Sequence, residues 1–520
     1  MTVPDHRGAA GELDDAGVST PPIAEAGRES VAVSRKTVVA SAGWSAMGRT
    51  GAQALQFLAG LALARILAPA DFGLLASVYV ITGFTVLLFD MGLSAALVHQ
   101  REVRQADYDT AFWLNALGGL VFIGVLAALG PFVADFYGDD RLTWITPLAG
   151  LGFALALNVS HAALLQRSMQ FKKVAAIELS CAVLANAATL IGALSGMGAF
   201  ALVLGPAVQG LAGTIITWTL VRWRPRGFIS RPSVRRLWSF SGGMLGFSVV
   251  NYAGRNSDNL LIGRLLGATA LGYYNRAYTL MLLPLQQISQ VLGRVMFPAL
   301  AAMQGDRERL QGAYRRVILV MTAVIMPVLV GMAAVADGLV PLLWGDQWLL
   351  AIPLLQVLCL AGLPQCLSNS EGWLYQSQGR TQTMFRVGLV STLLTVIAIV
   401  IGLRWGALGV AVALLAKFWL WQPVGFHIAC STIGLKARRV FLDIVPPLAA
   451  SAVMGGVAWA IPWALDVPRQ DVFWLLVRVA VGAGLYVGCL ALFGRRVLGE
   501  IVSLMPSRLL RRLPARFRRS

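Results

Sequence analysis

The chain has 520 residues, of which 57% are hydrophobic and only 13% are charged. An ordinary soluble domain carries about 25% charged residues, so this composition excludes a water-soluble protein and indicates that apolar surface faces lipid. The net charge of +18 would indicate a nucleic-acid partner in a soluble protein. Here the basic residues cluster at the ends of apolar segments, which is typical of membrane topology, and no nucleic-acid partner is expected.

The first 36 residues are polar. They include six acidic residues and the pair Pro21 and Pro22, and they lack the apolar stretch of a signal peptide. We expect residues 1–36 to form a disordered cytoplasmic tail.

The rest of the chain is a series of apolar segments, and the fold class we expect is an all-α integral membrane protein. A helix needs about 20 mostly apolar residues to cross a membrane, because lipid offers backbone groups no partner. About fourteen segments meet this requirement, with approximate limits 38–64, 72–98, 108–134, 142–165, 174–196, 198–221, 237–262, 270–298, 315–336, 350–376, 383–403, 405–430, 441–463 and 472–494.

Basic residues are unevenly divided between the connecting loops. Loops after even-numbered segments are rich in arginine and lysine, whereas loops after odd-numbered segments carry acidic residues such as Asp139 and Asp346. The positive-inside rule then predicts a multi-pass protein of a bacterial inner membrane with both termini in the cytoplasm. The arginine-rich residues 495–520 fit a cytoplasmic tail that contacts anionic membrane lipids.

The chain repeats itself at an offset near 200 residues. Arg65-Ile66-Leu67 followed by Phe72-Gly73-Leu74-Leu75 is echoed by Arg264-Leu265-Leu266 followed by Leu271-Gly272-Tyr273-Tyr274. Six segments separate the copies, so two parallel six-helix repeats are expected, related by an axis along the membrane normal. The expected parts after the tail are an N-terminal lobe 37–222, a basic cytoplasmic linker 223–236, a C-terminal lobe 237–430, two additional transmembrane helices 431–494 and the basic tail 495–520.

These motifs, together with Asp90-Met91-Gly92-Leu93-Ser94-Ala95-Ala96-Leu97 and Asp258-Asn259-Leu260-Leu261-Ile262-Gly263-Arg264, carry a family resemblance. Over about residues 36 to 490 the chain resembles the Wzx-type lipopolysaccharide and exopolysaccharide flippases of the multidrug/oligosaccharidyl-lipid/polysaccharide exporter superfamily. The resemblance implies two lobes around a central cavity. It also implies that an undecaprenyl-pyrophosphate-linked oligosaccharide unit is flipped from the cytoplasmic to the periplasmic leaflet, beside partner glycosyltransferases and a polysaccharide polymerase.

Polar stripes on two of the apolar segments indicate the binding site. The first segment carries Arg49, Gln53 and Gln56 at helical spacing, and the seventh carries Asn251, Arg255 and Asn259. Intramembrane ionisable groups usually face a bundle interior or a wet cavity, and arginine forms paired hydrogen bonds to phosphate oxygens. We expect these six residues to bind substrate in one hydrophilic cavity lined from both sides.

Other intramembrane charges have less defined roles. Asp90, Asp258 and Lys417 are candidates for coupling or gating, although Asp258 could equally form a structural ion pair with Arg255 three residues away. Arg478 lies near the end of its segment, and we expect it to snorkel to the interface.

The sequence offers little chemistry for catalysis. Five cysteines and four histidines lack metal-binding spacings, and no HExxH, GxSxG, Walker A or GxGxxG motif is present. We expect no catalytic residue, metal or cofactor. The alternatives are a cation-coupled drug or metabolite antiporter of the same superfamily and, with little support from the short outer loops, a membrane glycosyltransferase or polymerase.

The expected topology is testable with reporter fusions. A reporter active only outside the cytoplasm should give signal when fused at Asp139 and none when fused at Arg231, because the loops that hold these residues lie on opposite sides of the membrane. The reversed pattern would overturn the assignment of both termini to the cytoplasm.

Overall fold

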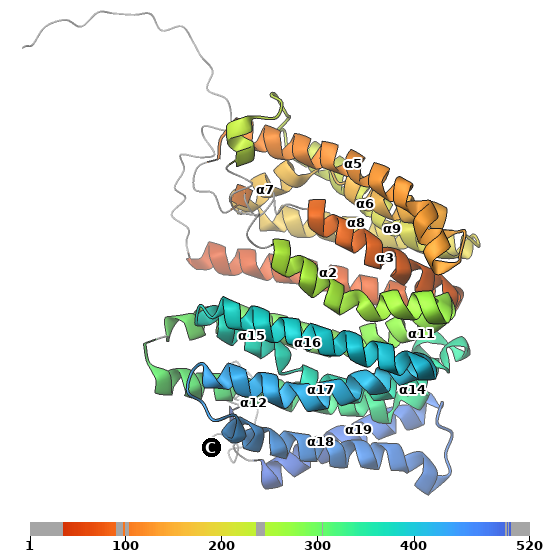
Figure 1. Cartoon of the computed structure of the whole chain (residues 1–520), viewed down its shortest axis with the longest axis vertical. Coiled ribbons are helices and arrows are strands. Elements are labelled where there is room, and N and C mark those ends of the chain that lie inside the picture. The colour runs from red at the N-terminus through yellow and green to blue at the C-terminus, as the bar shows by residue number, and fades with distance from the viewer. Residues whose placement is uncertain are drawn as a thin grey trace, which may run out of the picture.

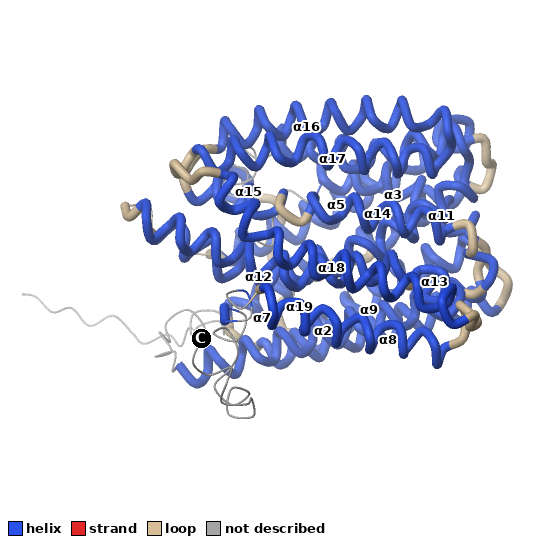
Figure 2. The backbone as a smooth tube through the Cα atoms, turned by 90° about the horizontal axis from the view of Figure 1, so that it is seen from below, coloured by secondary structure: helices blue, strands red, loops and turns tan. Residues whose placement is uncertain are grey.

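A computed structural model describes residues 35–89, 97–98, 103–235, 245–303, 305–494, 497 and 499–500. Every regular element within these ranges is a helix (Figure 2). The expected tails 1–36 and 495–520 fall almost wholly outside the described residues. The helices are α2 (Arg35–Ile66), α3 (Pro69–Phe89), α5 (Gln105–Tyr137), α6 (Leu142–Ala154), α7 (Val159–Arg167), α8 (Phe171–Leu194), α9 (Ala199–Leu220), α11 (Leu245–Ala302), α12 (Arg307–Ala334), α13 (Ala336–Trp344), η2 (Asp346–Trp348), α14 (Ala351–Gln365), α15 (Ser368–Ser377), α16 (Thr381–Gly402), η3 (Leu403–Trp405), α17 (Gly406–Ser431), α18 (Ala437–Leu465) and α19 (Val472–Phe493).

The helices lie side by side, with α5, α6, α8 and α9 towards one end of the long axis and α12 to α19 towards the other (Figure 1). Helices α2 and α11 lie between the two groups. The largest cluster of buried apolar side chains joins α2, α3 and α11 to α12, α14 and α17. The expected domain limits are not tested by this arrangement and stay a prediction.

In the described part of the chain, ten helical stretches are long and apolar enough to cross a membrane. Helices α2 and α11 are not among them, because their polar residues lower their hydropathy, and α16 and α17 count as one continuous stretch. Two expected spans are each broken into two helices, α6 with α7 and α14 with α15. The exact count of fourteen transmembrane helices therefore stays a prediction.

Helix α11 contains two of the expected spans joined through a single glycine. Gly267 has φ 83° and ψ 172°, a conformation that residues with a Cβ rarely adopt, and it ends a first arm at residues 245–266 before a second arm at 268–302. The arms run alongside one another, since Tyr274 of the second arm donates a hydrogen bond to Asp258 of the first, 2.8 Å away.

The two copies of the repeated motif meet each other across the middle of the molecule. A Cβ added to Gly73 would lie 1.7 Å from the carbonyl oxygen of Ala268, and one added to Gly272 would lie 1.9 Å from that of Pro69. Gly73 and Gly272 occupy equivalent positions in the two repeats, as do Pro69 and Ala268, so the same contact is made twice, once from each repeat. Only glycine permits this backbone approach between α3 and the second arm of α11.

The basic linker is attached to the N-terminal helices over its described part. The carboxylate of Asp109 in α5 accepts hydrogen bonds from the backbone N–H groups of Arg226, at 3.2 Å, and Gly227, at 3.0 Å. Trp113 of α5 donates to the carbonyl of Gly227 at 3.0 Å. Residues 221–230 therefore follow the surface of α5 before the chain continues toward α11.

The expectation that Arg478 snorkels to the interface is wrong. Its side chain is fully buried and binds three groups: the Asp337 carboxylate at 2.9 Å, the Ala458 carbonyl at 2.8 Å and the Ala334 carbonyl at 2.6 Å. Packing of α19 against α13 and α18 closes off the route to the interface. Arg478 thus ties the last two helices to the rest of the bundle.

Replacing Arg478 by methionine should lower stability strongly. The substitution leaves the Asp337 carboxylate without its cation, and breaking one partner of a buried ion pair typically costs about 3–5 kcal/mol. Thermal unfolding of the detergent-solubilised protein measures the effect. The matched control is Arg469→Met, at an exposed arginine over the Trp463 ring, which should cost less than about 1 kcal/mol. Equal melting temperatures for the two variants would contradict the role of Arg478.

Candidate functional site

Two large cavities flank α11. The interlobe cavity, of about 780 Å³, is lined by α2, α3, α8, α9 and both arms of α11. The C-terminal cavity, of about 920 Å³, is lined by both arms of α11 together with α14, α15, α16 and α17. The two arms of α11 are thus the wall that the cavities share.

The first arm of α11 serves both cavities because it is polar on two faces. Asn256 and Asn259 are three residues apart and line the interlobe cavity. Arg255 and Asp258 have the same spacing but are turned by one residue, about 100° around the helix, and they line the C-terminal cavity. A helix with a polar group on each face is costly to place in lipid, and both faces are here turned toward protein-lined space.

The structure brings together part of the expected substrate site. Arg49, Gln53, Gln56 and Asn259 all line the interlobe cavity, so the stripe on α2 does face α11. Gln287 on the second arm donates a hydrogen bond to Gln53 at 3.3 Å.

Other expected site residues lie elsewhere. Arg255 faces the C-terminal cavity instead of sharing one cavity with the α2 stripe, and the coupling or gating candidates Asp258 and Lys417 line the C-terminal cavity too. Asn251 belongs to the first arm of α11, and the position of its side chain is not described. Asp90 lies outside the described residues.

Arg276 is a cation of the interlobe cavity that the sequence analysis did not include in the substrate site. Its guanidinium lies 3.9 Å from the centre of the Phe72 ring and donates to the Gly60 carbonyl at 3.3 Å. Its Nε is buried and has no hydrogen-bond partner among the described residues. A charge within an apolar span was the available signal, but the sequence does not show which way the helix is turned.

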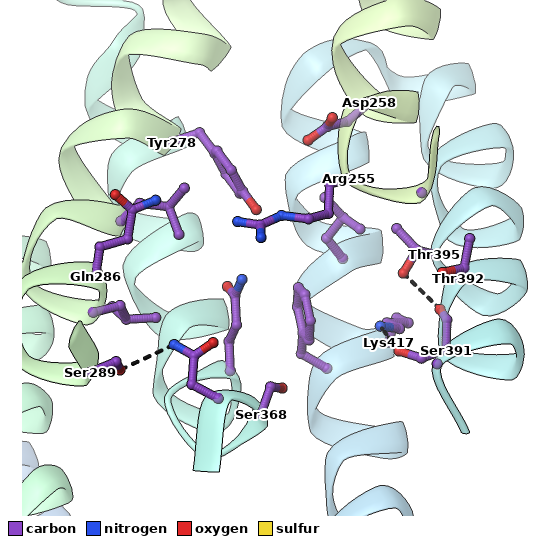
Figure 3. Close-up of a pocket in the computed structure, with 18 of the residues that line it drawn as sticks. Arg255, Asp258, Tyr278, Gln286, Ser289, Ser368, Ser391, Thr392, Thr395 and Lys417 are labelled. Atoms are coloured by element: carbon purple, nitrogen blue, oxygen red, sulfur yellow. Dashed lines mark hydrogen bonds between the residues drawn. The ribbon is translucent and has the colours of Figure 1, made fainter. Parts of the chain in front are cut away.

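Asp258 is not paired with Arg255 in this structure. Its carboxylate accepts hydrogen bonds from the Tyr274 hydroxyl at 2.8 Å and from the backbone N–H of Asn259 at 2.8 Å. Arg255 instead projects into the C-terminal cavity toward Tyr278 (Figure 3). Its guanidinium therefore faces the cavity and is placed to meet an anionic ligand.

Lys417 lies on the far wall of the same cavity, beside a buried acid. Its ammonium group donates to the Ser391 hydroxyl at 3.0 Å and lies 4.3 Å from the centre of the Phe418 ring (Figure 3). Nearby Glu371 is 8% exposed and accepts a hydrogen bond from Gln422. The sequence analysis did not single out Glu371, because one acid inside a long mostly apolar segment carries no spacing signal.

Contacts between the two groups of helices form a lock that closes one end of the interlobe cavity, next to Leu63. We call this the acidic end, because Asp139, Asp346 and Asp466 lie there. Here η2 caps the last turn of α2. The Trp348 indole N–H donates to the Ala64 carbonyl at 2.8 Å, and the Gln347 amide donates to the same carbonyl at 2.7 Å. The Trp348 ring also packs edge-on against Phe72 at 5.5 Å.

No group of three or more histidine, cysteine, aspartate or glutamate side chains that could hold a metal ion occurs among the described residues. The described residues instead form polar cavities between helices, on either side of the contact between the two copies of the repeated motif. This arrangement is that of a membrane transporter.

Solved structures share this fold. The inward closed conformation of the lipid II flippase MurJ superposes with a TM-score of 0.66 at 14% identity, covering 87% of this chain and 99% of that one. An inward-facing multidrug resistance MATE family transporter of the MOP superfamily gives a TM-score of 0.56 at 13% identity, covering 73% and 94%.

The chain belongs to the polysaccharide biosynthesis protein family, whose model matches residues 62–353. It is 29% identical over 500 residues to the succinoglycan biosynthesis transport protein ExoT of Rhizobium meliloti, covering 93% of this chain and 98% of that one. It is 28% identical over 435 residues to the lipopolysaccharide biosynthesis protein WzxC of Escherichia coli, covering 82% and 88%. The family resemblance and the all-helical membrane fold expected from the sequence are both confirmed.

The lock at the acidic end yields a prediction. A double variant, Gln347→Ala with Trp348→Phe, removes the donors to the last turn of α2, and an unmade buried hydrogen bond costs about 1–3 kcal/mol. Opening at this end should become about tenfold more frequent or greater. It is measured as the labelling rate of Leu63→Cys by a membrane-impermeant maleimide, in a Cys489→Ala background because the other four cysteines are buried.

The control for this experiment is Gln356→Ala, which removes a side-chain amide whose bond, to the Ala333 carbonyl, stays within the C-terminal helices. The control should label like the parent protein. If the double variant also labels at the parent rate, the lock does not hold the acidic end closed.

Proposed function

We propose that this protein is a flippase that moves an undecaprenyl-pyrophosphate-linked oligosaccharide unit from the cytoplasmic to the periplasmic leaflet for cell-surface polysaccharide biosynthesis. The observation that carries the proposal is the interlobe cavity. It is polar, it is enclosed by apolar helices, and it contains Arg276 with a buried N–H donor that no described protein group accepts. An anionic group of the substrate satisfies that donor.

The residue types around the interlobe cavity fit a phosphate joined to a sugar. Arg49 and Arg276 supply positive charge, and a guanidinium binds two phosphate oxygens at once. Gln53, Gln56 and Asn259 supply amides that pair with hydroxyl groups. Glu178 also lines the cavity. Its carboxyl oxygens can accept hydrogen bonds from sugar hydroxyl groups.

The names of the relatives support the same reading. ExoT is a succinoglycan biosynthesis transport protein, WzxC is a lipopolysaccharide biosynthesis protein and MurJ is a lipid II flippase. Each name refers to a polysaccharide or to a lipid-linked saccharide. We extend that substrate class to this chain, together with a bacterial inner-membrane location, cytoplasmic termini and partner glycosyltransferases and a polymerase.

Alternating access is the mechanism that the arrangement favours. The acidic end is closed by the η2 contacts to α2, so we expect the substrate to enter from the opposite, basic end and to leave after the lock opens. Asp258 and Lys417 remain proposed coupling or gating groups, as does Asp90. Asn251 and Arg255 complete the proposed substrate-binding set.

A cation-coupled drug antiporter is the second candidate, favoured by the shared fold of the MATE transporter. It requires a cation site open to the cavity. Here Asp258 is held by Tyr274 and by backbone, and the cations Arg49 and Arg276 outnumber the acid Glu178 in the lining of the interlobe cavity. The charge of the cavity therefore favours an anionic substrate.

Replacing Arg276 or Arg49 by glutamine should reduce export of polysaccharide about tenfold or more, because a hydrogen bond to a charged group contributes about 1.5–3 kcal/mol. The measurement is cell-surface polysaccharide in cells that lack the native gene copy, normalised to the amount of protein in the membrane. Arg276→Lys, which keeps the charge, should retain more activity than Arg276→Gln.

The control is Arg404→Gln, at an exposed arginine of η3 that lines neither cavity. It should export normally. Full export by both cavity variants at normal protein levels would rule out an anion site in the interlobe cavity.

A further inference from the structure

The C-terminal cavity differs in chemistry from the interlobe cavity. Most of its polar lining is neutral and includes four amides, Gln286, Gln290, Gln365 and Asn369. Serine and threonine hydroxyls from α11, α15 and α16 complete the lining (Figure 3). Each amide offers two donors and an acceptor, so this surface matches a ligand that is rich in hydroxyl groups.

One of these amides has a buried atom that protein does not satisfy. The carbonyl oxygen of Gln365 is buried and has no hydrogen-bond partner among the described residues. Gln286 and Gln290 are exposed along one side of the second arm of α11, where they line the cavity. Asn369 donates to the Ser289 hydroxyl at 3.1 Å. A buried acceptor without a donor costs free energy, so a ligand hydroxyl that reaches Gln365 would be bound favourably.

Aromatic side chains lie among the amides. Tyr278, Trp373 and Phe418 line the same cavity. Gly293 makes room for Trp373, since a Cβ at that position would lie 3.0 Å from the indole nitrogen. Flat apolar rings with polar edges, set among amides, match a sugar ring, which has both apolar C–H faces and hydroxyl edges.

The volume is also sufficient. At about 920 Å³ the cavity is near the upper limit of the range of about 300–1,000 Å³ that is typical of small-molecule sites. This volume is larger than a single sugar ring requires. An oligosaccharide of several sugars fills it better.

We propose that the C-terminal cavity holds the saccharide part of the substrate and selects for its length and composition, an inference that rests on the proposed function. The two arms of α11 separate this cavity from the interlobe cavity, so a substrate that also reaches Arg49 and Arg276 must pass around an edge of this wall. Arg255, which projects into the C-terminal cavity, then meets the phosphate attached to the first sugar. Amides that bind hydroxyl groups discriminate well, because an analogue that lacks a hydroxyl leaves them unpaired.

A side chain added at Gly388 tests this proposal without removing any existing group. Gly388 lines the cavity on α16, and a Cβ at that position has no heavy atom within 4 Å. Leucine there projects into the cavity, and it favours a helix more than glycine does, so the helix itself is not weakened. The control is Gly484→Leu on α19, where a Cβ also meets nothing within 4 Å and which lines neither of the two cavities.

The proteins are compared in proteoliposomes with two probes. One is undecaprenyl pyrophosphate carrying the complete oligosaccharide, extracted from cells that lack this gene, and the other is undecaprenyl pyrophosphate carrying only the first sugar. Transfer across the bilayer is followed by oxidation of the sugar with membrane-impermeant periodate. Gly388→Leu should slow transfer of the complete unit about tenfold or more and slow the single-sugar probe much less. Gly484→Leu should transfer both like the parent protein.

The other outcomes separate two failures. If the parent protein moves neither probe, the proposed function fails. If the parent protein moves the probes and Gly388→Leu affects them equally, or affects neither, the C-terminal cavity does not hold the saccharide. Should Gly388→Leu fail to reconstitute, Gln290→Leu removes an exposed cavity amide at nearly constant volume, and the same difference between the two probes is required of it.

Discussion

The close approach of α3 to the second arm of α11 is the constraint on which the rest of the structure depends. Gly73 lies against the Ala268 carbonyl and Gly272 against that of Pro69, so one motif, copied at an offset of about 200 residues, makes a self-complementary contact. A contact of this kind is normally found between identical subunits, where each residue meets the equivalent of its partner. Here it joins two parts of one chain, and the interlobe cavity and the lock at η2 both lie against the helices that it brings together.

The broad architecture could be predicted from the sequence because it follows from composition and periodicity. Polar residues spaced three or four apart mark the wet face of α2, and the structure turns Arg49, Gln53 and Gln56 into a cavity. The repeated motif indicates a duplication from the sequence alone. What such patterns cannot give is the rotation of a helix about its axis relative to neighbours that are distant in sequence.

That limit explains where the sequence analysis and the structure differ. Arg255 and Asn259 belong to the same polar segment, yet they face different cavities, because the wall formed by α11 is polar on both sides. The sequence does not reveal the partners of Arg478, because Ala334, Asp337 and Ala458 lie on three other helices, α12, α13 and α18. Arg276 was known only as a charge in an apolar segment. In each case a contact between distant segments decides the role of the residue.

The single-residue turn at Gly267 has a mechanical consequence. Tyr274 and Asp258 fasten the two arms of α11 to each other, so we expect the hairpin to move as one lever rather than as two independent helices. Because the same lever forms the boundary of both cavities, a tilt that widens one compartment narrows the other. We therefore expect uptake of a ligand in one cavity to change the shape of the other, without a loop or a separate domain to transmit the change.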